Sequence, residues 1–167
     1  MLRGMNENEF WSVIDRSREG GADEQEERLQ ELLTGRPRDE LEAFDRIYRE
    51  QLVRAYRWDL WGAGYVIAGG MSDDSFDYFC GWLIGQGRDV FEAALADPES
   101  LADVPAAAEE EVESEGLRYA VQEAYESTHG EELPIGGPTP PSEPAGEAWD
   151  EDDVDSRYPR LAAKFGA

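Results

Sequence analysis

The stretch from Trp58 to Ala68 is the feature that most constrains the fold of this chain. It places apolar residues on nearly every side of a helix, and such a helix needs neighbours all round it, because a helix at the surface keeps one polar face. Gly62 and Gly64 inside the stretch cost helical stability relative to alanine, so we expect them to allow another segment to pack closely. The stretch therefore predicts a buried helix among other helices.

Apolar residues recur at helical spacing along most of the remaining chain, with glycine or proline between the segments. No segment shows sustained period-two alternation, and no hairpin turn joins two β-rich runs. The helices are predicted over residues 6–18, 23–35, 37–57, 58–68, 73–85, 88–96 and 106–129, with Asp23 as the cap of the second. Five Trp, seven Tyr and six Phe supply bulky groups for a core. The predicted fold is an all-α, compact multi-helix bundle of about six to seven helices.

The composition changes near residue 130. Residues 1–130 form the predicted helical domain, whereas residues 131–167 read as an extended Pro/Gly-rich linker followed by an acidic tail. A free tail has little need of large apolar groups, yet this one carries Trp149, Tyr158, Leu161 and Phe165. We expect these four side chains to dock part of the tail on the body; the alternative is a disordered tail.

The formal net charge is −24, and residues 101–167 contribute −13 of it. Such a field repels phosphate backbones and anionic lipids, so it disfavours direct nucleic-acid and membrane binding. It favours a basic partner protein or cations, although solubility alone would also account for it. Cys80 is the only cysteine. Together with the absence of a signal-peptide pattern and of a long apolar run, this indicates a cytoplasmic protein.

The block from Gly69 to Gly87, with Ser72-Asp73-Asp74-Ser75-Phe76-Asp77 near its start, resembles a bacterial family known only as domain of unknown function 4240. Further similar segments are Phe10–Arg18, Tyr56–Ile67, Val90–Pro98 and the helix around Glu123–Tyr125, so that the resemblance covers residues 6–130. It implies a helical domain and brings no established reaction. Cys80 and Met71 depart from the residues common in the family, which implies that neither sulfur is a required nucleophile.

Asp73, Asp74 and Asp77 are the sharpest candidate site. On a helix, the first and last of these residues are four positions apart, so the three carboxylates could converge on Mg²⁺ or Ca²⁺, which prefer oxygen ligands. The simpler interpretation is helix capping, in which Ser72 accepts a backbone hydrogen bond and the first carboxylates favour the positive end of the helix dipole. We favour capping, and no cofactor is required by the sequence.

Asp15, Arg16 and Arg88 are further binding candidates, and we expect the segment around residues 15–18 to pair with the Asp73 block. Most charges of this kind are solvated or structural. A nucleophile pair of Cys80 with His129, the only histidine, lacks a third orienting group in the sequence. We expect the thiol to be buried and structural.

Three functional hypotheses follow. The first is a non-enzymatic protein-interaction or regulatory module whose acidic surface binds a basic partner. The second is a metal-dependent or small-molecule enzyme that uses Asp73, Asp74 and Asp77. The third is an inhibitor that mimics nucleic acid, with carboxylates spaced along one face like phosphates.

Overall fold

The computed structural model describes residues 5–21, 24–109, 112–114 and 116–166. Within these ranges it contains eleven helices, and its only β-type pairing is one isolated bridge. The helices are α1 (Glu7–Ser17), α2 (Gln25–Leu33), α3 (Arg38–Ala55), α4 (Trp58–Ala68), α5 (Asp73–Gly85), α6 (Arg88–Ala96), η2 (Pro98–Asp103), α7 (Pro105–Glu109), α8 (Gly116–His129), α9 (Val154–Arg157) and α10 (Pro159–Phe165). The all-α prediction is confirmed. The number of helices exceeds the predicted six to seven because short helices form after α6 and in the C-terminal segment.

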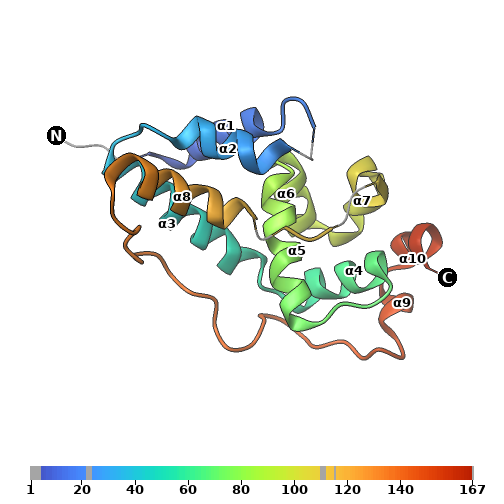
Figure 1. Ribbon diagram of the computed structural model, residues 1–167. Coiled ribbons are helices and arrows are strands. Elements are labelled where there is room, and N and C mark those ends of the chain that lie inside the picture. The colour runs from blue at the N-terminus through green and yellow to red at the C-terminus, as the bar shows by residue number, and fades with distance from the viewer. Residues whose placement is uncertain (1–4, 22–23, 110–111, 115, 167) are drawn as a thin grey trace.

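Helix α5 is central in the fold (Figure 1) and packs against α1, α3, α4, α6 and α8. On one side of it, α1, α2, α3 and α8 pack together; on the other, α4 packs with η2, α9 and α10. The prediction of a buried aromatic core is confirmed at Phe76 and Phe79, which are fully buried in α5, and at Phe10 and Phe44 from the first group of helices.

Local sequence explains where the central helices begin and end. The Asn6 side chain accepts a hydrogen bond from the backbone N–H of Glu9, and the Ser72 side chain accepts one from Ser75. Gly69 ends α4 in the left-handed region with φ of 72°, a conformation that suits glycine. Asp23, the predicted cap of the second helix, lies outside the described residues.

The prediction of one long helix from residue 106 to 129 is wrong. Helix α7 ends at residue 109, and the chain passes through Val112 and Ser114 before α8 begins at residue 116. In this connection the backbone N–H of Ser114 donates to the Tyr78 carbonyl, and Val112 is buried. A side chain at Gly81 would collide with the Ser114 carbonyl oxygen. The segment leaves helical geometry because it crosses α5 at very close range.

The glycines inside α4 have the role expected of them. A Cβ atom at Gly62 would lie 2.6–2.9 Å from the Tyr158 ring and hydroxyl, and one at Gly64 would lie 2.8 Å from the Met71 sulfur. These distances are shorter than ordinary van der Waals contact. Both glycines therefore admit a neighbouring side chain, as the sequence predicts.

The segment after α8 runs back across the molecule to α4 (Figure 1). Tyr158 donates a hydrogen bond to the Asp59 carbonyl at 2.6 Å, and Leu161 is fully buried. Arg160 forms an ion pair with Asp103 at 2.6 Å. The C-terminal helices are thus attached to α4 and η2. The boundary between a domain and a tail at residue 130 stays a prediction.

Candidate functional site

The three carboxylates at the start of α5 do not converge. Asp73 and Asp74 are exposed in the first turn, where they favour the positive end of the helix dipole. Asp77 faces α8, where Arg118 lies 3.5 Å away. Among the described residues, no three His, Cys, Asp or Glu side chains are grouped as a metal site requires. The geometry of this block corresponds to helix capping and one ion pair between helices.

The segment around Asp15 lies at the other end of α5. Arg18 donates a hydrogen bond to the Gly85 carbonyl at 3.1 Å, and a Cβ atom at Gly87 would lie 2.6 Å from the Asp15 carboxylate. Because α5 has 13 residues, its ends are roughly 18 Å apart at 1.5 Å per residue. The expected pairing with the Asp73 block is therefore wrong.

Asp15, Arg16 and Arg88 instead line one hollow of about 350 Å³ between α1 and the start of α6. Arg88 donates a hydrogen bond to the Asn8 side chain at 2.7 Å, which ties the two helices together. Partial burial and the neighbouring Asp89 carboxylate raise the pKa of Asp15 above its usual range, against the opposing effect of Arg18. The hollow brings three carboxylates and two guanidinium groups together, but all five side chains lie at the open surface.

Cys80 and His129 lie in separate environments. The Cys80 thiol is buried in α5 and points at the Ala55 carbonyl, 3.8 Å away. Burial raises the pKa of this thiol far above its usual range, so it stays protonated at neutral pH. The His129 imidazole, at the end of α8, instead forms a hydrogen bond with the Arg36 carbonyl at 2.9 Å. This arrangement lacks the activated thiolate that nucleophilic catalysis requires.

Helices α2 and α8 lie side by side and form a surface that the sequence alone did not reveal. A side chain at Gly116, where α8 begins, would collide with the Glu26 carboxylate in the first turn of α2. At the other end, the Gly35 N–H donates to the Thr128 hydroxyl at 2.9 Å. Since the two starts and the two ends meet, the helices run parallel.

The parallel pair carries several exposed carboxylates. We use the name α2–α8 acidic face for four of them: Glu27, Glu31, Glu123 and Glu126. None of the four forms an ion pair within the part of the chain that the structure describes. The cations of the same helices are engaged elsewhere, since Arg28 contacts Glu24 and Arg118 contacts Asp77. The signals available in the sequence were the i, i+4 spacing of Glu27 and Glu31 and the i, i+3 spacing of Glu123 and Glu126.

The two glutamates of α2, together with Gln30 and Thr34, also line a hollow of about 460 Å³. Two like charges one helical turn apart repel each other. A cation bound between them would relieve this repulsion, so the arrangement suits a lysine or arginine side chain better than an anion.

Comparison with known proteins gives the family of this chain. Residues 5–127 match the model of the family described as "Protein of unknown function (DUF4240)". The match covers most of the chain and contains α1 to α6 and nearly all of α8, so the chain belongs to this family. It ends before the C-terminal segment that carries Ala145, Trp149 and Tyr158. No curated protein and no solved structure matches the chain.

Among the described residues, no helix has both the length and the apolar character needed to cross a membrane.

Proposed function

We propose that this chain is a non-enzymatic interaction module that binds a basic protein through the α2–α8 acidic face. The observation that supports it is that four exposed carboxylates on two parallel helices form no ion pair with any other described residue. Their charges are available to an incoming lysine- or arginine-rich surface, because the basic side chains of both helices are held by other partners. The overall charge of −24 adds long-range attraction for such a partner.

The geometry supports the enzymatic alternative less well. Asp73, Asp74 and Asp77 do not share one ligand position, and the Cys80 thiol is buried and protonated. The hollow between α1 and α6 offers mixed charges, but its best-placed cation, Arg88, is already bound to Asn8. An interaction surface needs only exposed, correctly placed charges, which the α2–α8 acidic face provides.

The test is fluorescence anisotropy with a labelled deca-lysine peptide and two variants of equal net charge. The face variant is Glu27→Gln/Glu31→Gln/Glu123→Gln/Glu126→Gln. The control variant, Glu132→Gln/Glu147→Gln/Glu151→Gln/Asp152→Asn, neutralises four exposed acids of the C-terminal segment. Because both variants lose four negative charges, a difference in their peptide affinity reports the position of the charges and not the total charge.

We expect the face variant to weaken peptide binding by roughly tenfold and the control variant by less than about threefold. Binding to the wild-type protein should also fall steeply between roughly 50 and 500 mM salt, since exposed charges are screened. Equal losses in the two variants would show that the peptide responds only to total charge, and the proposed site would then be wrong.

A further inference from the structure

The outer side of α4 carries a group of aromatic rings that a distant part of the chain covers. Trp58 and Trp61 stack at 5.0 Å between ring centroids, and Tyr65 lies one turn further along the helix. Trp149 packs against all three rings, at 6.0, 5.8 and 5.0 Å. Its indole N–H donates to the Trp58 carbonyl at 2.8 Å. These contacts form a socket filled by a single tryptophan.

Main-chain pairing holds the same segment beside the start of α4. The Trp58 N–H donates to the Ala145 carbonyl at 2.9 Å, and the Ala145 N–H donates to the Tyr56 carbonyl at 3.0 Å. Ala145 thereby forms a parallel bridge with Arg57. An extended segment that pairs with exposed backbone while one side chain fills a pocket is a recurring mode of peptide recognition. We call residues 56–65, with this backbone edge and these rings, the α4 groove.

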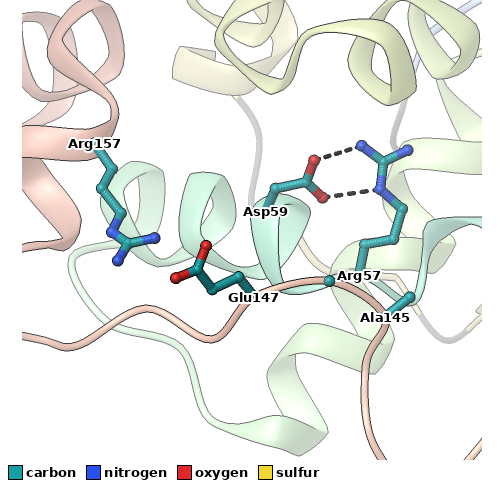
Figure 2. Close-up of a pocket in the computed structure, with 6 residues that line it drawn as sticks. Arg57, Asp59, Ala145, Glu147 and Arg157 are labelled. Atoms are coloured by element: carbon teal, nitrogen blue, oxygen red, sulfur yellow. Dashed lines mark hydrogen bonds and ion pairs between the residues drawn. The ribbon is translucent and has the colours of Figure 1, made fainter.

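Figure 2 shows the backbone edge of the groove and the space beside it. Arg57 donates two hydrogen bonds to the Asp59 carboxylate, and Ala145 and Glu147 of the C-terminal segment lie beside this pair. Arg57 also donates to the Leu95 carbonyl at 2.9 Å, which fixes the edge against α6. Together with Arg157, these residues border a hollow of about 410 Å³. These bonds tie the edge to the helices of the protein, and the hollow leaves room next to the bound segment.

The segment that fills the groove is held lightly on the side that leads to α8. Residues 134–148 are almost entirely exposed or half-buried, and Ile135 is 81% exposed. Segments with few buried contacts open locally at low free energy while the rest of the protein stays folded. Local opening on this side would leave the contacts of Trp149 and the pairing of Ala145 as the main bonds that hold residues 145–149 in the groove.

Charge opposes the contact that the structure contains. From Glu143 to Asp155 the segment carries seven acids and no basic residue, and it docks on a protein that is itself strongly negative. Burial raises the pKa of Tyr56 above its usual range, and Cys80, Asp73, Asp77 and Glu143 raise it further. The segment reaches its site because it is tethered, which gives it a high effective concentration. A basic segment from another protein would instead be attracted by the net negative charge of the protein, since Arg57 and Arg157 at this site are paired with Asp59 and Asp153.

We propose that the α4 groove is the recognition site for an extended, basic, tryptophan-bearing segment of a partner protein, and that residues 145–149 of this chain occupy it as an internal competitor. The groove lies on a different face from α2 and α8, so this proposal stands or falls independently of the proposed function. The partner tryptophan would take the position of Trp149, and its backbone would pair with Tyr56 and Trp58. Lysine or arginine residues around that tryptophan would lie where the acids of the internal segment lie.

The experiment uses the full-length protein and a labelled peptide with the sequence of residues 141–153 in which the six acids are replaced by lysine. Binding is measured by fluorescence anisotropy to the wild type and to Trp149→Ala and Ala145→Pro. The first substitution empties the socket, and the second removes the N–H that pairs with Tyr56. Ile135→Ala, on the exposed linker, is the matched control.

We expect the two groove-emptying variants to bind the peptide at least about tenfold more tightly than the wild type or Ile135→Ala, because the internal competitor is weakened. A second peptide, with alanine in place of its tryptophan, should show no such gain. Neutralising the α2–α8 acidic face should leave the gain unchanged, which separates this site from that face.

Equal affinity of the wild type and both variants, with unchanged far-UV circular dichroism, would overturn the proposal. So would a gain that does not need the tryptophan of the peptide. If Trp149→Ala unfolds, the decision rests on Ala145→Pro, which weakens the internal segment by removing one main-chain hydrogen bond and changes no aromatic side chain.

Discussion

Gly62→Ala should destabilise the protein when Tyr158 is present and stabilise it when the Tyr158 side chain is removed. In the wild type, the new methyl group would lie 2.6–2.9 Å from the Tyr158 side chain, so the ring has to move. The displaced hydroxyl loses its hydrogen bond to the Asp59 carbonyl, which contributes about 1 kcal/mol. If roughly 80 Å² of ring surface returns to water, another 2 kcal/mol or so is lost at about 25 cal/mol per Å².

Alanine also stabilises a helix by about 1 kcal/mol relative to glycine, which offsets part of this loss. The net expectation for Gly62→Ala is a destabilisation of about 2 kcal/mol. In a Tyr158→Ala background the ring is absent, and all three atoms nearest to the new methyl group belong to that side chain. The same substitution should then stabilise the protein by about 1 kcal/mol from helix propensity alone.

The assay is urea unfolding of the four proteins of this cycle, followed by far-UV circular dichroism. Tyr158→Phe serves as the matched control: it removes the hydroxyl and keeps the ring, so Gly62→Ala should still destabilise that protein. If Gly62→Ala stabilises both the wild type and the Tyr158→Ala protein, Tyr158 does not lie close to α4. The attachment of the C-terminal helices to α4 would then be refuted as well.

Two further predictions concern ionisable groups. Burial, and next the Asp59 carboxylate, raise the pKa of Tyr158 to about 12. Since an unfolded tyrosine ionises near pH 10, the stability that the neutral hydroxyl contributes should be complete below about pH 10 and lost as the pH rises towards 12. Urea midpoints measured across this range should therefore fall more for the wild type than for Tyr158→Phe, and parallel curves would contradict the burial. The Cys80 thiol is buried and its pKa is raised, so a thiol reagent such as Ellman's reagent should react slowly with the native protein at pH 8 and rapidly after unfolding in urea; fast reaction in the native state would contradict its position.

The helices of the central part of the fold were predictable because local signals coincide there. Apolar periodicity, the Ser72 cap and the glycines after α4 all indicate the same boundaries, and the structure has α4 and α5 where the sequence placed them. The break between α7 and α8 was not predictable in the same way. Its cause is the close crossing of Ser114 over Gly81, a contact between residues 33 positions apart that leaves no mark in either local pattern.

The same distinction holds for the candidate sites. The sequence indicates that Gly62 and Gly64 admit close neighbours, but only the fold shows that one of these neighbours is Tyr158, almost a hundred residues later. Asp15, Arg16 and Arg88 were each singled out from the sequence, whereas their meeting in one hollow depends on the fold, which places α1 near the start of α6. Total charge can be counted from the sequence. Which carboxylates lack a counterion depends on the positions of Arg28 and Arg118.

The stacked indoles of α4 have a consequence for spectroscopy. Trp58 and Trp61 lie almost parallel, with 8° between their planes, and Trp149 stands nearly perpendicular to both. Three of the five tryptophans are thus gathered in one chiral group, and their electronic transitions should couple. A split near-ultraviolet circular dichroism band would report this arrangement. Loss of the splitting would then show, without any added label, that the Trp149 indole has left the other two.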